Sequence, residues 1–192
     1  MNARVAAGTK AKVRLPFLAL SLALCAAAAP GSSSDFPDEV IIRDGLTFPE
    51  NLTSLENGDL VFGSSTSSVI YRARGSEAEA TPWFDGKAAR LGRVLGVLAD
   101  EPRNILWVCS TSQAEARPNA DLTGLAAFSL EDGAVMGTYP FADGKGWCND
   151  IAVDGQGTVY ATDTMEGRVF RLPSLDDAAM QIWSDDPLLK GA

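Results

Sequence analysis

The sequence contains no histidine. This absence removes Ser-His-Asp and Cys-His catalysis, histidine-ligated zinc and histidine proton relays from the chemistry that these residues can perform by themselves. Acid–base chemistry would have to come from carboxylates, lysine or tyrosine. Helical patterns are also missing, because no segment after the N-terminal leader repeats apolar residues at the period of about 3.6 that marks an amphipathic helix.

Positive charge is scarce as well. The chain has 16 Lys and Arg against 25 Asp and Glu, for a formal net charge of −9. Four of the positive residues and none of the acidic ones lie within residues 1–29, so loss of that leader would take the charge from −9 to −13. Phosphate contacts need clustered Lys and Arg, and anionic membrane surfaces attract basic segments. We therefore expect no nucleic-acid partner and no attraction to a membrane surface.

The N-terminal leader has the pattern of an export signal. Residues 1–14 carry four basic side chains, residues 15–28 are apolar apart from Ser21, and residues 26–28 are alanines suited to cleavage. The pattern predicts a signal peptide over residues 1–29, a flexible tether over residues 30–37, and a secreted or periplasmic protein. The apolar run is shorter than the roughly 20 residues of a membrane span, so none is expected after cleavage. An N-terminal anchor and a lipoprotein attached at Cys25 are the alternatives.

A motif then occurs three times, over residues 50–64, 95–110 and 149–163. Each copy has a short apolar run, a polar turn and a second apolar run that ends in a small polar residue. The copies begin 45 and 54 residues apart, and self-similarity at such a period indicates a propeller or a solenoid. A third and a fourth apolar segment follow each copy, so each unit predicts the four antiparallel strands of one propeller blade.

The predicted fold is therefore an all-β propeller domain over residues 38–192, with blades near residues 48–84, 91–141 and 147–186. Trp107, Tyr160 and Phe62 are expected to share one position of the repeat and to be core residues between blades. A closed propeller needs roughly four to eight blades, so three blades predict a partial ring. Residues 187–192 look like the start of a fourth inner strand. A truncated product is the simpler explanation, and a half-ring completed by self-association is the alternative.

A partial ring leaves an open edge. The face of the last blade that carries Trp147, Tyr160 and Phe170 should lose part of its apolar partner, and large exposed apolar patches favour association. The sequence therefore predicts self-association through this edge.

Three cysteines are present, and signal cleavage would leave only Cys109 and Cys148. In an oxidising compartment two cysteines can pair, and both lie near the same end of neighbouring repeats. Two small buried thiols are the more common outcome, so both alternatives stay open.

Several segments together resemble a known family. They are Phe-Pro-Glu at 48–50, Leu-Gly-Val-Leu-Ala-Asp at 95–100, Trp-Val-Cys-Ser at 107–110, Trp-Cys-Asn-Asp-Ile-Ala-Val-Asp at 147–154, Thr-Val-Tyr-Ala-Thr-Asp at 158–163 and Gly-Arg-Val-Phe-Arg-Leu at 167–172. In this order they are similar to the gluconolactonases, senescence marker proteins and luciferin-regenerating enzymes, which are six-bladed propellers. The resemblance runs from about residue 48 to residue 192, roughly the first half of such a ring.

The resemblance implies an exported, divalent-metal-dependent hydrolase of the sugar-lactone lactonase type. Its members hold calcium or zinc on the central axis with a Glu, an Asn and an Asp from the tops of inner strands. Glu50 and Asn149 match the first two ligands, and hard cations prefer such oxygen donors. The Asp, which is also the family's proposed general base, would follow Ala192. No catalytic residue is therefore expected within the chain.

Other residues match the family in part. Arg93 matches an arginine that contacts the substrate, whereas Leu95 replaces an asparagine found in many members, so the resemblance does not imply specificity for sugar lactones. Asp150 and Asp163 are candidates for residues that orient the metal ligands without binding the metal. The alternatives are a solvated loop acid for Glu50, a turn residue for Asn149 and a surface ion pair for Arg93.

The sequence is compatible with two functions. The first is hydrolysis of a small-molecule substrate such as a lactone, whose ring opening needs no strong acid for the leaving group. The second is a non-catalytic exported propeller that binds a ligand or a protein partner, because propellers host unrelated functions. Leu95 and the missing general base favour this second function.

Overall fold

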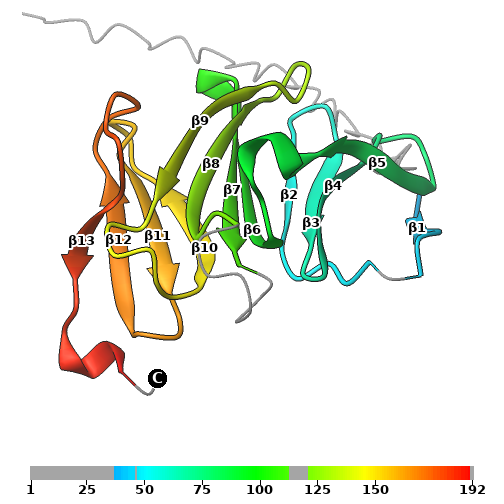
Figure 1. Ribbon diagram of the computed structural model, residues 1–192. Helices are drawn as coiled ribbons and strands as arrows, with labels where there is room; N and C mark the ends of the chain where they lie inside the picture. The colour runs from blue at the N-terminus through cyan, green and yellow to red at the C-terminus, as the bar shows by residue number, and fades with distance from the viewer. Residues whose placement is uncertain (1–36, 46, 113–120, 191–192) are drawn as a thin grey trace, which may run out of the picture. The chain divides into compact units, whose positions relative to one another are not determined.

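The structure, a computed structural model, describes residues 37–45, 47–112 and 121–190. The predicted signal peptide and nearly all of the predicted tether lie outside these residues. Within them, strands form three sheets that follow one another along the chain (Figure 1), and the predicted all-β class is confirmed. We call the sheets blades one, two and three.

Each blade is a meander of four antiparallel strands. Blade one consists of β2 (Leu52–Ser54), β3 (Leu60–Ser64), β4 (Ser67–Ala73) and β5 (Glu79–Asp85). Blade two consists of β6 (Arg93–Asp100), β7 (Ile105–Thr111), β8 (Gly124–Ser129) and β9 (Val135–Pro140). Blade three consists of β10 (Cys148–Val153), β11 (Val159–Asp163), β12 (Arg168–Leu172) and β13 (Gln181–Ser184).

The helices of the described residues are three short 3₁₀ turns, namely η1 (Gly86–Ala89), η2 (Glu101–Arg103) and η3 (Pro187–Leu189). Among the residues that the structure describes, no helix has the length and apolar character that a membrane span requires. The absence of a helical period in the sequence is thus matched in the described residues.

Polar side chains close the hairpins that lead into the second strands. Asp154 accepts hydrogen bonds from the N–H groups of Gln156 and Thr158, both at 2.9 Å, which is the turn chemistry expected of Asp. Gly157 completes that turn with φ of 93°, a conformation that favours glycine. The polar turns of the repeat therefore position the strands.

The core lies between neighbouring blades, because alternate side chains of a strand point to opposite faces. Val61 and Ile70 of blade one pack with Val108 and Phe128 of blade two. The opposite face of blade two packs against blade three in the same way. There the buried residues include Ile105, Trp107, Leu125, Phe141, Ala161 and Phe170.

Two sequence predictions about these faces are wrong. Phe62 stacks on Tyr71 on the side of blade one away from blade two, whereas Trp107 faces blade three. Phe62 lies two residues before the small polar residue that ends its motif copy, whereas Trp107 and Tyr160 lie three residues before theirs. A shift of one residue reverses the face of a strand on which a side chain lies. Phe170 is also not on an open face, because it is fully buried and stacks on Phe141 of blade two at 3.9 Å.

The face of blade three that points away from blade two carries Tyr160, Val169 and Trp183, and we call it the open face. Tyr160 and Val169 are half-buried and Trp183 is exposed. The rings of Tyr160 and Trp183 make an edge-to-face contact at 5.3 Å.

The outer side of blade one is covered instead. Residues 37–44, which we call the N-terminal cover, include β1 (Ile41–Ile42), a strand that pairs in parallel with β5. Val40 and Ile42 pack on the cluster that contains Phe62 and Tyr71. The Tyr71 hydroxyl donates to Asp44 at 2.7 Å. The sequence did not predict this fifth strand.

Candidate functional site

The candidate metal ligands occupy equivalent positions in blades one and three. The carbonyl groups of Phe48 and Trp147 each accept a hydrogen bond from the N–H of the first residue after the second strand, at 2.9 and 3.3 Å. Two residues beyond these carbonyls lie Glu50 and Asn149. Both therefore stand at the beginning of the innermost strand of their blade.

Blade two has the same arrangement with a different side chain. Val94 of β6 and Cys148 of β10 each pair with the polar residue near the end of the second strand. The next residues, Leu95 and Asn149, are therefore equivalent. The pairing register shifts directly after both pairs, so both residues lie within β-bulges, which re-aim side chains and are frequent beside active sites.

The innermost strands are in contact with one another at this level. In β6 the Val97 N–H donates to the Asn51 side-chain oxygen at 3.0 Å, which links β6 to β2. Gly96 lies against β10 so closely that a Cβ there would be 2.3 Å from the Asn149 carbonyl oxygen. Asn149 therefore lies against Gly96, and Asn51, the residue after Glu50, lies against the neighbouring Val97. Neither Asn51 nor Gly96 was predicted from the sequence as a link between blades.

A disulfide also ties the start of β10 to blade two. The sulfur atoms of Cys109 and Cys148 are 2.02 Å apart with Cα atoms 5.1 Å apart, and both residues are fully buried. The Thr111 hydroxyl donates to the Cys148 carbonyl oxygen at 3.4 Å. Of the two alternatives for these cysteines, the structure adopts the disulfide.

The three candidate side chains have no polar partner within the described residues. Glu50 is exposed, and Asn149 and Arg93 are half-buried. Within the described ranges none of the three side chains makes a hydrogen bond or an ion pair. Among the described residues, a ligand would therefore displace no hydrogen bond or ion pair at these groups.

These side chains do not complete a metal site. The described residues contain no group of three or more His, Cys, Asp or Glu arranged so that it could hold a metal ion. Glu50 and Asn149 would give two oxygen donors, whereas calcium takes about six to eight and zinc about four. The donors present are of the right chemical kind for calcium, and water or other donors would have to complete its coordination.

Asp163 fixes the backbone beside the site. It is fully buried, and it accepts hydrogen bonds from the N–H groups of Trp147 at 2.9 Å and Met165 at 3.2 Å and from Arg168 at 2.7 Å. Burial alone would lower the pKa of Arg168. The carboxylates of Asp143 and Asp163 raise it by more, so the pKa lies above its ordinary value. A pocket of about 180 Å³ opens between this turn and Leu189.

Asp150 has a local role in the structure. Its carboxylate accepts a hydrogen bond from the N–H of Ile151 at 2.9 Å, and its own N–H donates to the Thr162 hydroxyl at 3.0 Å. These bonds stabilise the bulge that contains Asn149. Asp150 and Asp163 thus hold the backbone around Asn149.

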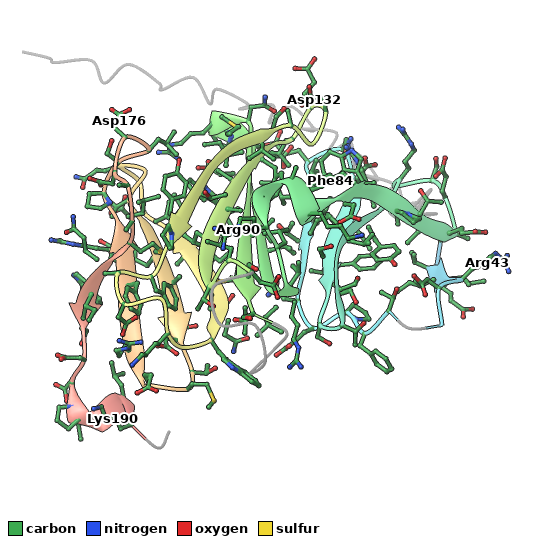
Figure 2. The ribbon with its side chains drawn as sticks, in the orientation of Figure 1. Arg43, Phe84, Arg90, Asp132, Asp176 and Lys190 are labelled. Atoms are coloured by element: carbon green, nitrogen blue, oxygen red, sulfur yellow. A yellow bond between two sulfur atoms is a disulfide. The ribbon has the colours of Figure 1, made fainter. Side chains whose placement is uncertain are left out.

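The site lies at the end of blade three that carries η3. Gly167, in the turn between β11 and β12, approaches the Leu189 backbone so closely that a Cβ there would be 2.6 Å from the Leu189 oxygen. Figure 2 shows Lys190, the next residue, at the opposite end of the blade from Asp176 in the β12–β13 turn. The start of β10 pairs with the end of β11, so it lies at the same end of blade three as Lys190.

Comparison with known proteins gives a fold but no family. No family model matches the chain, and no curated protein matches its sequence. A gluconolactonase from Xanthomonas campestris is similar in structure, with 17% identity, a TM-score of 0.52, and coverage of 71% of this chain and 46% of that chain. Virginiamycin B lyase from Staphylococcus aureus follows with 13% identity, a TM-score of 0.54, and coverage of 73% and 42%.

A chain of the nidogen/laminin complex is similar to the same degree, with 15% identity, a TM-score of 0.53, and coverage of 74% of this chain and 50% of that chain. The chain therefore spans about half the length of these structures or slightly less. The predicted β-propeller fold, of a kind that includes a gluconolactonase, is confirmed. Because these neighbours differ in function, the fold does not choose between them.

Proposed function

We propose that the chain contributes part of the active site of an exported, cation-dependent hydrolase of the lactonase type. The observation that carries the proposal is the equivalence of Glu50 and Asn149. Each follows by two residues a carbonyl that accepts a hydrogen bond from the first residue after the second strand, so the two occupy the same position of the repeat. Two oxygen donors aligned in this way from separate blades suit a cation on a shared axis.

The proposal gives each residue a role. The Glu50 carboxylate and the Asn149 amide oxygen would bind calcium or zinc together with donors other than the described side chains. Such a cation supplies polarisation of a substrate carbonyl. Arg93 would stabilise negative charge on a substrate oxygen, as positioned cations do. No described residue is assigned as the general base.

Export is part of the proposal. Its support is the predicted signal over residues 1–29 together with the Cys109–Cys148 disulfide, because disulfides persist in oxidising compartments.

Calorimetric titration of the purified chain with calcium and with zinc tests the metal role. We expect binding that weakens at least about tenfold in Glu50→Gln and in Asn149→Ala, since affinity depends on the number and charge of the ligands. Glu131→Gln, which changes an exposed acid in the β8–β9 turn, should bind like the unchanged chain. Equal affinity in all four proteins would contradict the proposal.

A non-catalytic binding protein is the second candidate. Leu95 favours it, because an apolar side chain occupies the blade-two position equivalent to Glu50 and Asn149. Because no described residue is assigned as the general base, turnover must be measured in a protein that also supplies one. Lactone turnover by that protein that depends on Glu50 would support the enzyme, whereas ligand binding without turnover would support the binding protein.

A further inference from the structure

The residues two positions before the candidate site form a second equivalent set. The register that aligns Glu50, Leu95 and Asn149 also aligns Phe48, Arg93 and Trp147. Each member of the second set therefore lies at the same end of its blade as the candidate site, two positions before Glu50, Leu95 or Asn149. We call Phe48, Arg93 and Trp147 the rim.

The aromatic side chains of the rim are exposed although their backbones are fixed. Phe48 is 57% exposed and Trp147 is 40% exposed. The Phe48 carbonyl accepts from both the N–H and the hydroxyl of Ser65, at 2.9 and 3.0 Å. The Trp147 N–H donates to Asp163 at 2.9 Å. A fixed backbone lowers the entropy cost of binding a ligand.

Asp163 also fixes the backbone of a further exposed apolar residue near the Trp147 backbone. The carboxylate oxygen that accepts from Trp147 also accepts from the N–H of Met165 at 3.2 Å. Met165 is 61% exposed. Single exposed apolar residues need no explanation. Phe48 and Trp147, however, recur at equivalent places in two blades, two residues before Glu50 and Asn149, whose side chains have no polar partner among the described residues. Binding pockets combine such apolar surface with a few oriented polar groups.

We propose that the site accepts lactones or esters that carry an apolar substituent, in preference to polyhydroxylated sugar lactones. This inference rests on the proposed function. Phe48 and Trp147 would contact the apolar substituent, and Arg93 between them would contact the carbonyl oxygen. Leu95 is buried and offers no hydrogen bond to a sugar hydroxyl at the third equivalent position, and an unpaired hydroxyl in a binding site costs affinity.

Binding of two lactones with the same ring size tests this inference. The probes are δ-decalactone and D-glucono-1,5-lactone, titrated calorimetrically against the full chain in calcium. We expect δ-decalactone to bind at least about tenfold more tightly, since burial of its alkyl chain is favourable. Trp147→Ala and Phe48→Ala should each weaken δ-decalactone binding about five- to tenfold. Trp183→Ala removes an exposed tryptophan of β13 and should leave binding unchanged.

The outcomes separate the two proposals. Equal or tighter binding of the sugar lactone, or no binding of either lactone, would overturn the preference for apolar substituents even if calcium binding still depends on Glu50. Equal effects of the Trp147 and Trp183 substitutions would also overturn it. Because Phe48→Ala changes a mostly exposed side chain, it provides the test if Trp147→Ala lowers stability. Loss of the Glu50 dependence of calcium binding would contradict the proposed function alone.

Discussion

At the scale of single residues, buried carboxylates hold the turns of this protein. Asp59 is buried and accepts hydrogen bonds from Arg72 at 2.7 Å and from the Gly75 N–H at 2.9 Å. Burial would raise the pKa of Asp59, but the hydrogen bonds from Gly75 and Arg72 lower it more, so the pKa lies below its ordinary value of 3.8. The sequence predicted the polar turn of the first motif copy but not the hydrogen bonds that Asp59 makes there.

A lowered pKa makes stability depend on pH in one direction. The unfolded chain binds the Asp59 proton at higher pH than the folded chain does. The stabilisation is therefore present above the ordinary pKa and is lost as pH falls through the lower pKa of the folded state. Asp59→Asn should lower the free energy of unfolding at pH 7 by about 1.5–3 kcal/mol and by less at pH 3. Urea unfolding at both values measures this, with Glu131→Gln as control. An equal deficit at both pH values would show that the charge is not responsible.

At the scale of strands, the close approach of β6 to β10 sets the position of Asn149. Gly96→Ala would place a methyl group 2.3 Å from the Asn149 carbonyl oxygen, so one strand must move. We expect a loss of stability of about 1–3 kcal/mol together with weaker cation binding. Gly155→Ala is the matched control, because a Cβ there meets no atom within 4 Å. Thermal unfolding and metal titration of both variants check this, and similar behaviour of the two would contradict the role of Gly96.

The disulfide joins the same strands covalently. Cys109 and Cys148 are 39 residues apart, and closing a loop of this length stabilises a fold by about 3–4 kcal/mol in the chain-entropy description. The double variant Cys109→Ala/Cys148→Ala should therefore unfold at lower temperature, and its melting temperature should not respond to a reducing agent. Calorimetry with and without reductant measures both effects. If the chain with both cysteines melts at the same temperature with and without reductant, the disulfide does not stabilise the fold.

The blades were predictable from the sequence because the alternation of apolar residues and the turn residues are local signals. The faces were less predictable. The prediction put Phe62 on the wrong face of its strand, because Phe62 lies one residue closer to the end of its motif copy than Trp107 does. The bulge at Asn149 could not be predicted either, since it depends on pairing between strands. The role of Asp163 had a signal, because each motif copy ends in a small polar residue.

At the scale of the whole described domain, the two outer sides differ. Blade one is covered by residues 37–44, whereas the open face of blade three leaves Trp183 56% exposed. We therefore expect the chain to self-associate through the open face at concentrations of about 10–100 µM, since exposed apolar faces favour association. Sedimentation velocity should show weaker association in Trp183→Lys than in Met136→Lys, a control on β9 that changes a residue of similar exposure, 49%. A monomer throughout this range would contradict the expectation.

The N-terminal cover has a consequence for how far such association can proceed. Two copies that join open face to open face would bury that face in both, and such a symmetric contact does not extend further. Head-to-tail growth would need the outer side of blade one, where Val40, Ile42 and Asp44 already occupy the contacts of Phe62 and Tyr71. Head-to-tail contacts extend into filaments when the copies do not close into a ring. If the chain associates as expected, β1 and its neighbours would therefore favour symmetric dimers over filaments.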